Sequence, residues 1–171
     1  SLGSDSAKLF KGTKIASDPD YEKYRNKYNV IHLDISSFWD FHKKDIVEKI
    51  IEDIFKELKM DYPEEFDERD RISYVLMKIY EKTGIPFVII VDEWDCVVRN
   101  STDQDLIHQY LQFLHSLFKS EESKSFLALG YITGIIPIKK IKAESAIYNF
   151  EEYSMLKSRP ITKYYGFTEE E

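Results

Sequence analysis

The most informative stretch of the chain is Phe87-Val-Ile-Ile-Val-Asp-Glu-Trp-Asp95. Its first five residues are apolar and follow Pro86, a pattern typical of a β-strand that is buried on both faces. A strand of this kind needs a covering layer on each side, which favours a parallel sheet packed between helices. The acidic residues Asp92, Glu93 and Asp95 follow the apolar run directly. They are therefore expected at the carboxyl end of the strand, where open α/β sheets bind their ligands.

Apolar periodicity on both sides of this strand predicts the other elements. Helical spacing predicts one helix over residues 40–60, a second over 72–84, and a third that begins after Asp103 and runs to Phe118. Short apolar runs predict two further strands at residues 30–35 and 126–132. Strands that alternate with helices imply right-handed parallel crossovers. The fold class expected is therefore α/β, with a three-layer arrangement around a parallel sheet.

Length and composition are those of one globular unit. The chain has 171 residues, of which 43% are hydrophobic, enough for a sizeable core. We predict a single domain over residues 1–171, and we interpret Ser1-Leu-Gly-Ser4 as an expression scar because of its small, structureless composition.

Charge and cysteine content exclude several classes of protein. The net charge is −7 and the basic residues are scattered, so the basic stripe of a nucleic-acid-binding protein is missing. Cys96 is the single cysteine, so the chain forms no internal disulfide, which fits a reducing cytoplasm. No apolar run reaches the roughly 20 residues that cross a bilayer. We expect a cytoplasmic protein that does not enter the membrane.

The acidic pair at the end of the apolar strand 87–91 has a recognised chemistry. In nucleoside-triphosphate hydrolysis, one acid at such a strand end holds Mg²⁺, and a neighbouring acid orients or deprotonates the attacking water. Asp92 and Glu93 have this spacing. An acidic turn that closes a strand and faces solvent has the same pattern, and motif matches of this length include false positives. For Asp95 we expect an exposed loop acid; the alternative is a side chain that supports the site indirectly, through a neighbouring residue.

Several other stretches occur in the fixed order of one protein family. They are residues 9–14, 28–36, 131–140, 145–155 and 165–170, taken together with Val88-Ile-Ile-Val-Asp-Glu-Trp-Asp95. In these stretches the chain resembles the Predicted-AAA-ATPase family of bacterial P-loop proteins over nearly its whole length. The resemblance implies a P-loop NTPase-like core that uses ATP and Mg²⁺.

The resemblance also assigns roles to three residues. Asp92 matches the Walker B acid that binds Mg²⁺ and contributes to nucleotide binding, and Glu93 matches the general base. Thr133 matches a sensor-type polar residue that contacts the γ-phosphate or the attacking water. The alternative for Thr133 is a threonine that ends a strand before the Gly134 turn.

One part of the family pattern is missing. Members carry, ahead of the region seen here, a strand and a Gly-rich phosphate loop ending in Gly-Lys-Ser/Thr. None of the six glycines lies in such a frame, and Gly12-Thr13-Lys14 has the wrong order. We therefore expect a truncated core that lacks its first strand and neither binds ATP tightly nor hydrolyses it alone. Residues 126–132 would then form a hydrophobic sheet edge prone to self-association.

Two other classes of function remain open at this point. The first is a non-hydrolytic module that keeps the fold and binds a protein partner. The second is a metal-dependent phosphoesterase built on Asp92, Glu93 and Asp95, with Asp34 as a further ligand from another strand end. Proteins similar to this chain often continue into a nuclease-like domain, so any contact with nucleic acid is expected only through regions outside this sequence.

Overall fold

The computed structural model describes residues 7–63, 67, 70–137 and 150–153. The Ser1–Ser4 tetrapeptide, the segment 165–170 and most of the segment 145–155 lie outside the described residues. The part of the family resemblance that rests on those two later segments therefore has no structural counterpart here.

Three parallel strands form a sheet in the order β1-β2-β3. They are β1 (Asn29–Asp34), β2 (Phe87–Asp92) and β3 (Leu127–Ile132). The first two strands pair in step from their first residues to their last, whereas the β2–β3 register shifts once near its start. All three predicted strands are present, and the α/β fold with a parallel sheet is confirmed.

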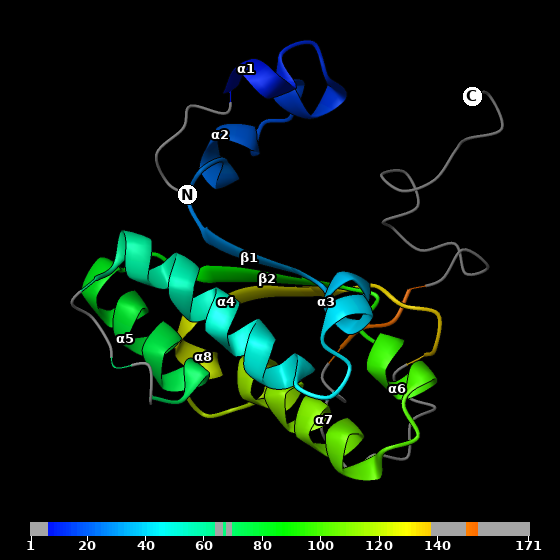
Figure 1. Ribbon diagram of the computed structural model, residues 1–171. Coiled ribbons are helices and arrows are strands. Elements are labelled where there is room, and N and C mark those ends of the chain that lie inside the picture. The colour runs from blue at the N-terminus through cyan, green and yellow to red at the C-terminus, as the bar shows by residue number, and fades with distance from the viewer. Residues whose placement is uncertain (1–6, 64–66, 68–69, 138–149, 154–171) are drawn as a thin grey trace, which may run out of the picture.

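Helices connect and flank the strands (Figure 1). The described ones are α1 (Ala7–Phe10), the 3-10 helix Lys14–Ser17, α2 (Tyr21–Tyr24), α3 (Ile35–Phe41), α4 (Ile46–Asp61), α5 (Ile72–Thr83), α6 (Cys96–Asn100), α7 (Gln104–Phe118) and α8 (Ser123–Phe126). The single helix predicted over residues 40–60 is wrong at its start. The chain leaves helical geometry at His42, and α4 begins only at Ile46, the first residue of the periodic apolar face.

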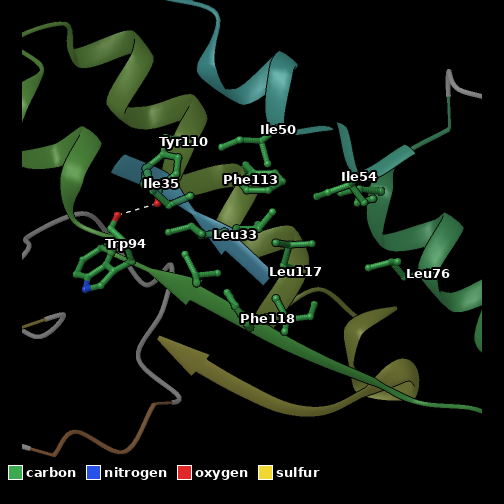
Figure 2. Close-up of a cluster of buried hydrophobic side chains, with 14 of the residues drawn as sticks. Leu33, Ile35, Ile50, Ile54, Leu76, Trp94, Tyr110, Phe113, Leu117 and Phe118 are labelled. Atoms are coloured by element: carbon green, nitrogen blue, oxygen red, sulfur yellow. Dashed lines mark hydrogen bonds between the residues drawn. The ribbon is translucent and has the colours of Figure 1, made fainter. Parts of the chain in front are cut away.

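The hydrophobic core lies between the sheet and the helices α4, α5 and α7, which Figure 1 shows together on one side of it. Alternate residues of β2 point into this core and are fully buried, whereas the residues between them are half-buried. These strand residues and the apolar faces of the three helices belong to one core cluster. Figure 2 shows side chains of the three helices, among them Ile54, Leu76 and Phe113, gathered near Leu33 of β1. Each Leu or Ile side chain buried in this way stabilises the fold by about 1.5–3 kcal/mol, which explains why helical periodicity located these elements.

The opposite face of the sheet remains accessible among the described residues. Val30 of β1 and Leu129 of β3 are each 55% exposed, and Tyr131 is 44% exposed. The sequence predicted a covering layer on both faces of β2, and the described helices α4, α5 and α7 supply it on one. β3 forms one edge of the sheet in the described part of the chain.

None of the helices in the described part of the chain has both the length and the apolar composition of a membrane-spanning segment.

Candidate functional site

Two of the predicted site residues meet at the carboxyl ends of neighbouring strands. Asp92 is the last residue of β2, and Thr133 follows β3 directly. The Thr133 hydroxyl donates a hydrogen bond to Asp92 Oδ1. The Thr133 amide donates to the carbonyl of Val91 at 2.9 Å, which extends the strand pairing by one step. The threonine is thus fixed by its backbone, and its side chain is held against the acid.

Glu93 contributes its backbone and its side chain to different contacts. Its φ is +49°, a left-handed conformation that is uncommon for a residue other than glycine. Its amide lies 3.1 Å from Asp92 Oδ1 and 3.3 Å from Thr133 Oγ1. Its carboxylate Oε2 accepts instead from Arg99 Nη2 of α6, at 3.1 Å. The strained turn therefore joins the Glu93 backbone to the Asp92–Thr133 pair and places its carboxylate against α6.

The expectation that Asp95 is an exposed loop acid is wrong, because its side chain is fully buried. Its Oδ2 accepts hydrogen bonds from the amides of Ile135 and Ile136, at 3.2 and 2.8 Å. Arg99 Nε lies 2.9 Å from the same oxygen. These donors replace the water that a carboxylate loses on burial. The signal for this contact was the spacing of four residues between Asp95 and Arg99, which places both on one side of a helical turn.

Trp94 and Gly134 complete the junction between the turn after β2 and the loop after β3. The Trp94 amide donates to the carbonyl of Thr133 at 2.9 Å, and the Trp94 carbonyl accepts from the Tyr110 hydroxyl at 2.7 Å (Figure 2). A Cβ on Gly134 would lie 2.6 Å from Trp94 Cδ1 and 2.7 Å from Asp95 Oδ1. Only glycine therefore fits at position 134 without a local rearrangement.

Asp34 ends β1 beside Asp92, its partner in the strand register, but it has a different role. It caps the N-terminus of α3, where its carboxylate accepts from the amides and hydroxyls of Ser36 and Ser37 at 2.6–3.3 Å. The hydroxyls of Ser37 and Ser36 lower the pKa of this carboxyl. The structure thus employs Asp34 in capping rather than as the further metal ligand that a phosphoesterase would need.

The oxygen donors at this edge of the sheet suit a hard cation. Asp92 offers a carboxylate and Thr133 a hydroxyl, both oxygen ligands of the type that Mg²⁺ prefers. No group of three or more His, Cys, Asp or Glu side chains able to hold a metal is found among the described residues. Mg²⁺ commonly binds through one or two protein oxygens and completes its shell with water and substrate phosphates. The residues present therefore fit Mg²⁺ that arrives with a nucleotide better than an ion held by protein alone.

Comparison with known proteins identifies the family of the chain. A family model described as Predicted AAA-ATPase matches residues 3–143, which include all three strands and the residues Asp92, Glu93 and Thr133. No curated protein and no solved structure gives a significant match to the chain. Since the family model covers well over half of the sequence, this chain belongs to the Predicted AAA-ATPase family.

Proposed function

We propose that this chain is the core of a Mg²⁺-dependent P-loop ATPase that binds and hydrolyses ATP in its intact form. The supporting observation is the contact between the Thr133 hydroxyl and the Asp92 carboxylate at neighbouring strand ends, with Glu93 next in the chain. This position at the carboxyl edge of a parallel sheet is where α/β proteins bind nucleotides. The description of the matching family, Predicted AAA-ATPase, suggests the same class of activity.

Each of the three side chains has a distinct role in the proposal. Asp92 holds Mg²⁺ directly or through water, and Mg²⁺ neutralises charge that develops on the phosphate oxygens. Glu93 orients the attacking water and accepts its proton. Thr133 contacts the γ-phosphate or that water through its hydroxyl. Its fixed backbone and its bond to Asp92 hold this hydroxyl close to the metal-binding acid.

The phosphate-binding loop belongs to another part of the intact protein in this proposal. The present sequence contains no Gly-Lys-Ser/Thr loop, and backbone amides of that loop supply much of the phosphate affinity in P-loop enzymes. The chain alone, a single truncated domain of a bacterial cytoplasmic protein, neither binds ATP tightly nor hydrolyses it. The strand that carries the loop would pair with β3, and without it the chain self-associates through residues 126–132.

A non-hydrolytic interaction module is the second candidate function. The observation that favours it is the accessible apolar face of the sheet, where Val30, Leu129 and Tyr131 are exposed. Exposed apolar patches of this kind often mark protein contacts. In this case the Asp92–Thr133 pair serves only to close the sheet.

Hydrolysis of ATP with Mg²⁺ by the intact protein separates the two functions. We expect activity that is lost in Glu93→Gln and absent from the present chain. Glu121→Gln is a matched control, since this exposed glutamate pairs with Lys124, three residues away, and is not one of the site residues. An inactive intact protein, or normal hydrolysis by Glu93→Gln, would exclude the ATPase assignment and favour the interaction module.

A further inference from the structure

Asp95 is the one charged residue that is buried in the part of the chain that the structure describes. A buried carboxylate is costly unless it is paired and hydrogen-bonded. Its Oδ2 has three donors, whereas its Oδ1 is buried with no hydrogen-bond partner among the described atoms. Removing solvent from an oxygen without replacing its hydrogen bonds costs stability, and such costs are found where a side chain serves a site.

One set of contacts joins Asp95 to the loop that carries Thr133. The amides of Ile135 and Ile136 both donate to Asp95 Oδ2. On the other side of Thr133, its own amide is held by β2. The backbone is therefore fixed immediately before and shortly after this residue, which keeps its side chain beside Asp92, where the hydroxyl bonds the carboxylate.

A second contact joins Asp95 to Glu93. Arg99 lies between the two acids, with Nε 2.9 Å from Asp95 Oδ2 and Nη2 3.1 Å from Glu93 Oε2. A guanidinium is planar, so fixing Nε also defines where Nη2 points. The Asp95 side chain is fully buried and the Glu93 side chain is 48% exposed. Asp95 is thus the immobile end of the chain of contacts, and Glu93 is the end that can exchange its partner.

We propose that Asp95 is the positioning residue of this site, and that its Oδ2, through the loop amides and Arg99, sets the placement of both Thr133 and the Glu93 carboxylate. The roles of those two residues in catalysis rest on the proposed ATPase function. The positioning itself is a property of this chain without nucleotide, so it is tested separately.

The test uses the ¹⁵N-labelled chain and follows hydrogen exchange of the Ile136 and Thr133 amides together with the Nε–H signal of Arg99. The Thr133 amide is an internal reference, since it bonds to β2 and not to Asp95. In Asp95→Ala we expect exchange at Ile136 to accelerate about tenfold or more relative to Thr133, because bonds to a charged acceptor are lost. The Arg99 Nε–H signal should also lose its protection.

Two further variants separate positioning from general stability. Asp95→Asn keeps an acceptor for the loop amides but removes the charge, so Ile136 should stay protected while Arg99 Nε–H exchanges faster. Asp103→Ala is the control, because Asp103 caps α7 with bonds of 3.0 and 3.2 Å and does not contact the site. This variant should change the exchange rates of the Ile136 and Thr133 amides by one common factor.

The proposal is overturned if Asp95→Ala accelerates hydrogen exchange of the Ile136 and Thr133 amides by the same factor, which would make Asp95 a purely structural residue. It is also overturned if Arg99 Nε–H is unaffected in Asp95→Asn, a variant that remains informative should Asp95→Ala not fold. Neither readout depends on hydrolysis. Normal hydrolysis by Glu93→Gln would exclude the ATPase assignment but would leave the positioning role of Asp95 intact. Failure of the positioning test would likewise leave the ATPase assignment intact.

Discussion

The hydroxyl of Tyr110 donates a hydrogen bond to the carbonyl of Trp94 at 2.7 Å and so joins α7 to the turn after β2. Tyr110 is fully buried, and Trp94 is 2% exposed. The bond connects the layer of helices to the turn that carries Glu93. The candidate site is therefore supported from within the core as well as by the neighbouring loop.

Removing this hydroxyl should destabilise the fold. We expect Tyr110→Phe to lower the free energy of unfolding by about 1–3 kcal/mol, because the buried Trp94 carbonyl loses its partner. Urea unfolding followed by circular dichroism measures the change. Tyr74→Phe is the control, since Tyr74 is 37% exposed. Equal stability of the two variants would mean that the Tyr110–Trp94 bond contributes nothing.

Tyr110 should also make the fold less stable at alkaline pH. Burial raises the pKa of Tyr110 well above its ordinary value of 10.0. Between these two pKa values the unfolded chain loses the proton and the folded chain keeps it, so stability is fully present below about pH 10 and falls as pH rises. Unfolding experiments at about pH 9 and about pH 11 should show a smaller decline in Tyr110→Phe than in the unmodified chain. An identical decline would contradict this contribution.

Asp34 should stabilise the fold as a helix cap, and this stabilisation should be lost at acidic pH. Asp34→Ala is expected to cost about 1 kcal/mol of stability, because α3 loses the acceptor of its first amides. Asp20→Ala is a matched control, since Asp20 precedes α2 without a side-chain capping bond. The depressed pKa of Asp34 means that its charge stabilises the fold above about pH 4 and that this contribution disappears as pH falls through the folded-state pKa. Denaturation of both variants and of the unmodified chain at neutral and at acidic pH measures each effect. If Asp34→Ala lowers the stability by the same amount at both pH values, the predicted pH dependence is refuted.

Gly134→Ala should disturb the junction between the two loops. The added Cβ would lie 2.6 Å from Trp94 Cδ1, closer than carbon atoms approach each other. We expect a loss of about 1–3 kcal/mol and a change in tryptophan fluorescence. Ile135→Ala truncates an exposed neighbour in the same loop and serves as the control. A Gly134→Ala variant as stable as Ile135→Ala would show that the loop has room to shift.

Self-association through β3 is tested by sedimentation over a concentration series. We expect the chain to form dimers or larger species and Leu129→Lys to remain monomeric, because a lysine on an edge strand opposes strand pairing. Leu9→Lys is the control, since Leu9 is exposed in α1, which lies apart from the sheet (Figure 1). A monomeric chain at every concentration, or equal association of both variants, would exclude pairing through residues 126–132.

Patterns that repeat along the sequence predicted most of the fold. The apolar run of β2 and the periodic faces of α4 and α7 specify local structure directly, because each residue of the pattern is buried for the same reason. The short helices α3 and α6 were missed, because each spans roughly two turns or fewer and therefore shows no apolar periodicity. The proximity of Asp92 and Thr133 in the structure fits the predicted parallel arrangement, in which strand ends meet at one edge.

Contacts between distant residues were beyond the sequence patterns. The burial of Asp95 depends on amides 40 and 41 positions away. The hydrogen bond from Tyr110 to Trp94 requires that α7 pack against the turn after β2. The residues on either side of Tyr110 and Trp94 in the sequence do not predict this contact. Side-chain roles at the site are thus set by tertiary packing, whereas the element that carries each side chain is set locally.

The register pairing of Asp34 with Asp92 makes two chemically unequal anions at one edge of the sheet. The charge of Asp34 is already balanced by the amides and hydroxyls at the start of α3. Among the residues that the structure describes, Asp92 accepts from fewer donors, namely one hydroxyl and the amide of the next residue. For the Mg²⁺ of the proposed function, this edge would therefore offer one receptive carboxylate rather than a symmetric pair, and that carboxylate belongs to β2 and not to β1.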